Sequence, residues 1–262
     1  AWGADGCVYA GGEAGQLYRI DIEKQTVKEY ANTNGFVLGI ALDIDNNVYA
    51  CDLEAKSVLK ITPSGEISTY SSGTLSIPML TPNYPAFDQQ GNLYVCDSGE
   101  WKQNNGRIYR IDPLGQTSVW NDNAKEFPNG LCMGIDEKYL YVAMSLGNPR
   151  VVRIEINDDG SSGDIETVVE LPRTVPDGVA FDAEGSLYIA CYRPDIIYKY
   201  SPTGELNVLA EDFEGTIMAA PTNIAFCGEN MDILLGANLG RWHITRYENK
   251  QPGLKLHYPA FK

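Results

Sequence analysis

A basic residue recurs six times between apolar residues on short predicted strands, at intervals of about 45 residues along the whole chain. A period of about 40 to 50 residues that contains only strands and turns is typical of a closed radial array, because each repeat can bury its sheet faces only against its neighbours. The period therefore predicts a ring of six sheets. The six basic residues are Arg19, Lys60, Arg110, Arg153, Lys199 and Arg246.

The clearest copy of the repeat spans residues 177–212. It contains four apolar runs, with turns at Glu184-Gly185 and Thr203-Gly204. Four short strands joined by glycine-bearing turns form one blade. We therefore predict an all-β fold, a six-bladed β-propeller with four-stranded antiparallel blades. The first copy, which begins at Ala1, lacks most of its inner strand, and the sixth copy ends with the segment "GLKLHY".

Six blades of about 44 residues use the whole chain, so we expect a single domain over residues 1–262. No apolar stretch approaches the roughly 20 residues that span a bilayer, and we expect no membrane partner. The six cysteines fall one per blade in mostly apolar runs, which is typical of buried thiols and favours a reducing, cytoplasmic location. Any upstream signal sequence would precede Ala1. We expect a monomer or a weak homo-oligomer.

The net charge of −15 argues against nucleic-acid partners. Binding to a polyanion depends on clustered Lys and Arg, whereas the 20 basic residues here are dispersed along the strands. A small-molecule substrate is the expected partner.

Polar side chains recur where the predicted inner strands begin, each close behind a proline: Asn83, Asn129, Asp177 and Asn223. Taken singly, each is an ordinary turn residue at a strand entry. Recurrence at one position of the repeat favours a shared site, because inner strands of a propeller begin together around the central channel. The second copy has Leu38 at this place, so the turn itself does not require an amide.

A carboxylate combined with amide oxygens suits a hard cation. Ca²⁺ accepts six to eight oxygen ligands with flexible geometry, whereas Zn²⁺ prefers His and Cys, which these strand starts do not supply. We therefore favour Ca²⁺, with Mg²⁺, Mn²⁺ and Zn²⁺ as alternatives. The candidate oxygen donors are the four strand-start side chains, and we expect Asn223 to contact the substrate.

The segments "VPDGVAFDAEGSLYIACY" (175–192), "PNGLCMGID" (128–136) and "PTNIAFCG" (221–228) resemble the senescence marker protein/gluconolactonase/luciferin-regenerating family of six-bladed propellers. The resemblance implies a metal-dependent hydrolase of lactones. It further implies that Asn129 and Asp177 are metal ligands, that Asp177 is also the proton acceptor, and that Asn83 contacts the substrate beside the metal.

The chain departs from the family pattern at two places. The resemblance implies a further acidic ligand, a Glu that would fall just before Ala1, with Trp2 at the end of its motif. Where many sugar lactonases of this family have Asn-Asp, this chain has Asn83-Tyr84. Tyr84 would remove a polar contact to substrate hydroxyls, so we expect a less sugar-like substrate.

Loops between second and third strands lie at the end where inner strands begin, and they carry further candidates for substrate contact: Trp101, Arg193, Arg241 and Trp242. The only histidines are His243, expected in a strand with its ring nitrogen bonded, and His257, expected in a last strand, so no Ser-His-Asp arrangement competes.

Two alternatives to the hydrolase remain: a propeller that binds a small molecule or protein without turnover, and a strictosidine-synthase-like propeller, suggested by "YAGGEAGQLYRID" in the first copy.

Overall fold

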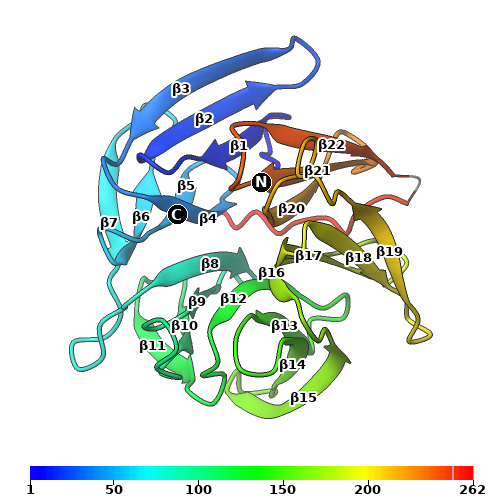
Figure 1. The fold of residues 1–262 in the computed structure, drawn as a ribbon. Coiled ribbons are helices and arrows are strands. Elements are labelled where there is room, and N and C mark those ends of the chain that lie inside the picture. Colours follow the sequence, from blue (N-terminus) through cyan, green and yellow to red (C-terminus); the bar gives the residue numbers. More distant parts are fainter. Residues whose placement is uncertain (250, 262) are drawn as a thin grey trace. The chain divides into compact units, whose positions relative to one another are not determined.

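The computed structural model describes residues 1–249 and 251–261, and these form strands and loops without a helix. The strands make six antiparallel sheets in which consecutive strands pair, and these are the blades of a six-bladed β-propeller, as the repeat predicts (Figure 1). Contact density divides the chain into two compact units, which we describe separately. Unit 1 contains residues 1–127 and 256–262, and unit 2 contains residues 128–255.

Unit 1 holds the first three blades. The first consists of β1 (Val8–Gly11), β2 (Gln16–Asp21) and β3 (Thr26–Asn32). The second consists of β4 (Val37–Leu42), β5 (Val48–Asp52), β6 (Ser57–Ile61) and β7 (Ile67–Ser71). The third consists of β8 (Pro82–Phe87), β9 (Leu93–Asp97), β10 (Arg107–Ile111) and β11 (Thr117–Asn121).

Unit 2 holds the other three blades. The fourth consists of β12 (Pro128–Met133), β13 (Tyr139–Met144), β14 (Arg150–Ile156) and β15 (Ser162–Glu170). The fifth consists of β16 (Val175–Phe181), β17 (Leu187–Arg193), β18 (Ile196–Tyr200) and β19 (Leu206–Glu211). The sixth consists of β20 (Pro221–Cys227), β21 (Ile233–Asn238) and β22 (Ile244–Glu248). Neighbouring inner strands touch within each unit: β4 touches β1 and β8, and β16 touches β12 and β20.

The prediction of four strands in every blade is wrong for the sixth. Among the described residues, no fourth strand follows β22. Instead, Gly253 bridges Asp182 just beyond β16, and Leu254 donates its N–H to the carbonyl of Phe181. His257 accordingly lies in an irregular segment and not in a strand. The first blade has three strands, and before β1 only an isolated bridge joins Trp2 to Val8.

The segment after Lys255 packs on unit 1. The hydroxyl of Tyr258 donates to the carbonyl of Trp2 at 2.7 Å, and the ring of Phe261 lies 6.0 Å from that of Tyr49 and 5.9 Å from that of Phe87. Phe87 is the last residue of β8, so Phe261 packs at the carboxyl end of this inner strand. Residues from the end of the chain therefore complete the core built by residues from its beginning.

Lys199 and Lys60 each pair with an acidic residue in the turn between the first and second strands of their blade, whereas Arg153 pairs with Glu166 of the outer strand β15. Lys199 Nζ lies 2.9 Å from an oxygen of Asp182, which is fully buried, and 5.0 Å from the ring centre of Tyr188. Asp182 also accepts the backbone N–H groups of Glu184 and Ser186. One carboxylate thus caps the turn and neutralises the cation, which explains why the basic residue recurs.

Lys60 and Arg19 repeat the arrangement in unit 1. Lys60 Nζ lies 3.9 Å from Asp43 and 5.4 Å from the ring centre of Tyr49, and Arg19 pairs with Asp5 at 2.7 Å. Lys199, Lys60 and Arg19 are therefore engaged in ion pairs that support their blades.

The second strands form the densest part of the core. Every residue of β5 and of β9 is buried, and Tyr49, Tyr94 and Tyr188 are almost fully enclosed. All six cysteines are free thiols, as expected, and burial raises the pKa of Cys227 to about 11. Thiolate chemistry is therefore disfavoured at this residue.

No helix in the described part of the chain is long and apolar enough to cross a membrane.

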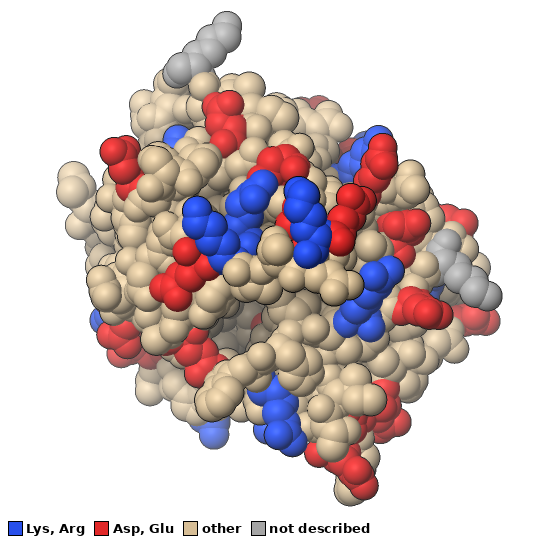
Figure 2. Space-filling view, turned by 90° about the horizontal axis from the view of Figure 1, so that it is seen from above, with Lys and Arg blue, Asp and Glu red and all other residues tan. Residues whose placement is uncertain are grey.

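Seen from above, the basic side chains lie beside acidic ones (Figure 2).

Candidate functional site

An irregularity in strand pairing occurs at the start of the inner strands, where the candidate residues lie. In β12, Pro128 pairs with Met144 and Leu131 with Val142, so Asn129 and Gly130 face one residue of β13. The same two-against-one pairing places Asp177 and Gly178 in a bulge of β16. A β-bulge releases side chains from the regular alternation and re-aims them, often beside active sites.

Glycine follows the polar residue in these bulges because the next inner strand comes very close. A Cβ on Gly130 would stand 2.7 Å from the Cα of Gly178, and a Cβ on Gly178 would stand 2.7 Å from the Cα of Asn223. Real Cβ atoms are essentially never found at such distances. The Asn-Gly and Asp-Gly pairs therefore bring β12, β16 and β20 together at the level of Asn129, Asp177 and Asn223.

Asn129 is held from one side by a buried hydroxyl. Its Nδ2 donates to Ser145 Oγ at 3.1 Å, and Asn129 is 5% exposed. A side-chain hydrogen bond from Asn129 also reaches the carboxylate of Asp177. The amide oxygen Oδ1 is buried and has no hydrogen-bond partner among the described residues. Leaving a buried carbonyl oxygen unsatisfied costs about 1–3 kcal/mol, so this atom is suited to accept a ligand.

Desolvation dominates the electrostatics of Asp177. It raises the pKa of the carboxyl well above the ordinary value of 3.8, and the hydrogen bond from Asn129 opposes this only in part. A carboxylate that is poorly solvated and lacks a basic neighbour gains strongly from a cation. Asp177 and the oxygen of Asn129 are thus the two groups in unit 2 that most need a positive partner.

Asn223 lies beside these two residues with its oxygen already in use. Its Oδ1 accepts the N–H of Ile224 at 2.9 Å and would lie 2.8 Å from a Cβ on Gly178. In β20 the extra residue is Thr222, because Asn223 itself pairs with Ala237. The side-chain oxygen of Asn223 is therefore engaged, whereas that of Asn129 has no hydrogen-bond partner among the described residues.

Asn83 and Tyr84 occupy the corresponding place in unit 1. Asn83 Nδ2 donates to Ser98 Oγ at 3.0 Å, the same kind of contact that Asn129 makes with Ser145. Tyr84 stands at the position where the bulges of β12 and β16 have a glycine. Its Cα would lie 2.8 Å from a Cβ on Gly39, so the tyrosine rests on the neighbouring inner strand β4.

The loop residues expected to contact substrate are anchored in different ways. Trp101, 61% exposed, packs edge-on against Phe127 with ring centres 5.3 Å apart. Arg193 pairs with Asp195 at 2.7 Å. It lies opposite Val175, which is the first residue of the inner strand β16. These loops begin at the same end of their sheets as the inner strands, as the topology predicts.

A second pair of loops is joined beside the start of β20. Arg241 Nε donates to the carbonyl of Gly215 at 3.2 Å, and His243 Nε2 lies 2.7 Å from the carbonyl of Ile217. The ring nitrogen of His243 is therefore bonded, as expected, although His243 lies just before β22 and not in it. Trp242 is fully exposed between these contacts.

The residues that are present fit a hard cation and not a softer metal. The described residues contain no group of three or more His, Cys, Asp and Glu side chains that could hold a metal ion. The donor set at the strand starts of unit 2 is one carboxylate and amide oxygens, which is the chemistry of Ca²⁺ or Mg²⁺ ligands and leaves positions for water. The oxygen of Asn129, which has no hydrogen-bond partner among the described residues, is available to accept such a ligand.

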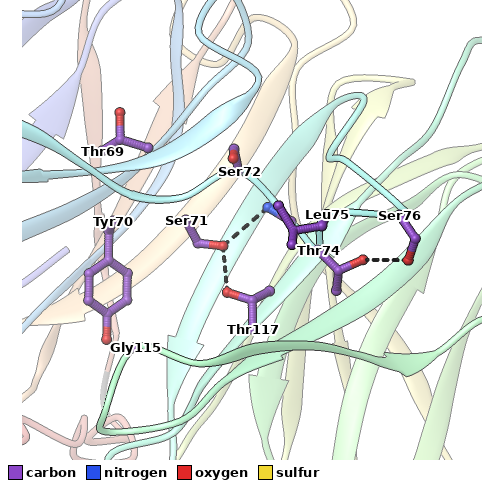
Figure 3. A pocket seen from close by; sticks show the side chains of 10 residues that line it. Thr69, Tyr70, Ser71, Ser72, Thr74, Leu75, Ser76, Gly115 and Thr117 are labelled. Atoms are coloured by element: carbon purple, nitrogen blue, oxygen red, sulfur yellow. Dashed lines mark hydrogen bonds between the residues drawn. The ribbon is translucent and has the colours of Figure 1, made fainter.

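An open groove of about 630 Å³ lies elsewhere in unit 1 (Figure 3). Its lining is rich in hydroxyl groups, and these bond to one another: Ser71 Oγ lies 2.7 Å from Thr117 Oγ1, and Thr74 Oγ1 lies 3.4 Å from Ser76 Oγ. It is lined from the outer strands β7 and β11 and contains no charged side chain. The groove therefore lacks the groups that catalysis or ion binding requires.

Ser98 and Ser145 were absent from the sequence-based candidates. Each lies one residue beyond the end of a second strand, β9 or β13, and contacts the asparagine of the adjacent inner strand. The signal that could have identified them is their shared position in the repeat, in "VCDS" and "VAMS".

Comparison with known proteins shows the family and the fold of the chain. The family model described as "SMP-30/Gluconolactonase/LRE-like region" matches residues 4–235. A curated relative, lactonase drp35 of Staphylococcus haemolyticus, is 23% identical over 205 residues, which cover 72% of this chain. The same residues cover 61% of the relative, so this chain spans less than two thirds of its length.

Solved structures show the same fold. A structure described as a putative gluconolactonase has a TM-score of 0.82 at 16% sequence identity. The alignment covers 97% of this chain and 89% of the chain in that structure. A structure described as a calcium-binding protein, regucalcin from Agrobacterium tumefaciens, has a TM-score of 0.80 at 16% sequence identity. The alignment covers 100% of this chain and 92% of the chain in that structure.

Proposed function

Because the chain belongs to the SMP-30/gluconolactonase/LRE-like family, we propose that it hydrolyses the cyclic ester of a lactone at the strand starts around Asp177. The observation that carries the proposal is the pairing of Asp177 with Asn129, whose buried oxygen has no hydrogen-bond partner among the described residues. The lactonase relative supports the reaction class, and the regucalcin likeness is consistent with a divalent cation, for which we favour Ca²⁺.

The Asp177 carboxylate and the Asn129 amide oxygen would hold the cation. Once bound there, a divalent cation supplies Lewis-acid polarisation of the lactone carbonyl. Asp177 is the one acidic side chain among the four strand-start candidates, so it is also the group that can accept a proton from the attacking water. A carboxylate that binds a cation has a lowered pKa and is a weak base, so its role as ligand dominates.

Substrate recognition falls to the neighbouring polar groups and the rim. Within unit 2, Asn223 contacts the substrate, and Arg193 and Arg241 line the approach. In unit 1, Asn83, Tyr84 and Trp101 are the residues that the sequence assigns to substrate contact. Tyr84 presents a ring where a small or acidic side chain would leave room for hydroxyl groups. We therefore propose a lactone with few hydroxyl groups, acted on by a protein without nucleic-acid or membrane partners.

A lactone panel tests the function. Hydrolysis of δ-valerolactone and of δ-gluconolactone is followed by proton release, with added Ca²⁺ and with chelator. We expect turnover that requires the ion and falls by about 10²-fold or more in Asp177→Ala, because that variant loses the charged ligand. The Asp177→Ala protein should remain folded by circular dichroism.

No turnover of any lactone with Ca²⁺, Mg²⁺ or Mn²⁺ supplied would contradict the hydrolase. Calcium binding without turnover would then favour the non-catalytic propeller. Equal turnover with and without chelator would leave a hydrolase but would refute the role of the cation.

A further inference from the structure

Ser145 connects the two residues of the candidate ion site. It lies one residue after β13 and is 2% exposed. Its Oγ donates to the carbonyl oxygen of Pro176 at 2.6 Å and accepts from Asn129 Nδ2 at 3.1 Å. Pro176 directly precedes Asp177, so one hydroxyl group links the side chain of one ligand to the backbone that carries the other.

The single proton of the hydroxyl determines which way the Asn129 amide faces. A carbonyl oxygen can only accept, so the proton of Ser145 must point to Pro176. Toward Asn129 the Ser145 oxygen can then only accept, and it must meet the NH₂ group of the amide and not its oxygen. The carbonyl of Pro176 thereby fixes the orientation of Asn129 through Ser145, with Oδ1 on the far side from the serine.

We propose that Ser145 is a positioning residue that locks the amide of Asn129 with its oxygen free to bind the ion. The inference rests on the proposed function, because Asn129 is a ligand only if the site takes a cation. Without the hydroxyl, the amide is held only by its hydrogen bond to the Asp177 carboxylate, which a bound cation would weaken. The amide can then turn over, and its NH₂ group would face the cation in some of the molecules. An amide NH₂ repels a cation, so the affinity falls with the fraction of wrongly turned amides.

The contact between a serine hydroxyl and an inner-strand asparagine occurs a second time in the chain, which supports a purpose beyond local packing. Ser98 Oγ accepts from Asn83 Nδ2 at 3.0 Å, from the equivalent position after β9. The second blade has Leu38 in place of the asparagine, and Leu53 stands in place of the serine. The hydroxyl is therefore present beside the two inner-strand asparagines that follow a proline directly and absent beside the leucine.

Two substitutions of nearly equal shape test the inference. Ser145→Thr keeps the hydroxyl, whereas Ser145→Val replaces it with a methyl group at the same steric cost. We expect Ca²⁺ affinity, measured by calorimetry, to be about 10- to 100-fold weaker in Ser145→Val than in Ser145→Thr, the range typical when an outer partner of a metal ligand is lost. In an Asn129→Ala background the difference should disappear, because the serine acts through that amide.

A second readout needs no ion. The side-chain NH₂ protons of Asn129, identified in nuclear magnetic resonance spectra by their loss in Asn129→Asp, should exchange slowly with solvent in Ser145→Thr and faster in Ser145→Val. Ser186, a buried serine in the turn before β17, supplies the control. Its Thr and Val variants should bind Ca²⁺ equally.

Equal ion affinity in the two Ser145 variants, or equal exchange of the Asn129 amide, would overturn the inference. If the unmodified protein takes up no Ca²⁺, the ion in the proposed function is refuted. The exchange comparison still decides whether Ser145 positions Asn129.

Discussion

The Cα of Asn223 in β20 lies 2.7 Å from the position that a Cβ on Gly178 in β16 would occupy. The two inner strands can therefore be this close only because residue 178 has no side chain. The position of Asp177 beside Asn223 depends directly on this glycine.

Gly178→Ala should destabilise the protein through crowding alone, since Gly178 does not have a positive φ. Overpacking of this kind costs about 1–3 kcal/mol, to be measured by urea unfolding. Gly115→Ala is the contrasting variant: Gly115 has open space around it and a φ of +80°, so only backbone strain of about 1 kcal/mol is expected. A Gly178→Ala protein as stable as the parent would show that the strands separate easily.

Asp177→Asn should stabilise the metal-free protein at neutral pH. The carboxyl has a pKa in the folded state well above 3.8, so the folded state holds its proton more tightly than the unfolded chain. Stability is therefore lost as the pH rises from about 3.8 through the folded pKa. The advantage of Asp177→Asn should grow over this range, measured by urea unfolding in chelator from pH 4 to pH 8.

The same carboxyl predicts the pH dependence of ion binding. A cation binds the deprotonated form, so Ca²⁺ affinity should increase with pH up to the folded pKa of Asp177 and binding should release protons. Calorimetry in two buffers with different heats of ionisation measures this release. Affinity that is constant from pH 4 to pH 8 would exclude Asp177 as the ligand.

Asp182→Ala should weaken the fold without weakening the ion site. It removes a fully buried carboxylate that holds Lys199 at 2.9 Å and accepts two backbone N–H groups. Breaking a buried pair from one side costs about 3–5 kcal/mol, and the partial exposure of Lys199 puts this case at the lower end. Ca²⁺ affinity, measured at a temperature where the variant is folded, should match that of the parent.

Tyr84→Asp should shift preference toward hydroxylated lactones. The substitution replaces a ring that rests on β4 near Gly39 with a short acceptor of hydrogen bonds. We expect kcat/KM for δ-gluconolactone relative to δ-valerolactone to rise roughly tenfold, about the value of one hydrogen bond. Tyr84→Ala separates the two effects, because it opens the space without adding an acceptor.

The period of the sequence predicted the number of sheets correctly. The site at the strand starts, which rests on the polar residue that recurs close behind a proline, stays a prediction. The recurring lysines and arginines also marked the blades correctly, and the structure supplies their cause in the buried Asp182 and its counterpart Asp43.

Other parts of the site depend on contacts that periodicity does not encode. Asn129 and Ser145 are 16 residues apart, and Ser145 and Pro176 are 31 apart, so their link exists only after two blades have packed. The extra residue in each inner strand was also missed, because a bulge changes pairing without changing composition. The end of the sixth blade was assigned to a fourth strand because the other copies of the repeat have four, but Gly253 and Leu254 find partners at the end of β16 and just beyond it instead.

The packing of Tyr258 and Phe261 onto unit 1 sets the order of events during synthesis. The first three blades leave the ribosome before any of unit 2, yet their core is completed by residues that are synthesised after the whole of unit 2. Unit 2 has all of its residues once Lys255 has emerged. For most chains the amino-terminal part folds first; here the amino-terminal unit is the one whose last contacts form only after the other unit has been completely synthesised.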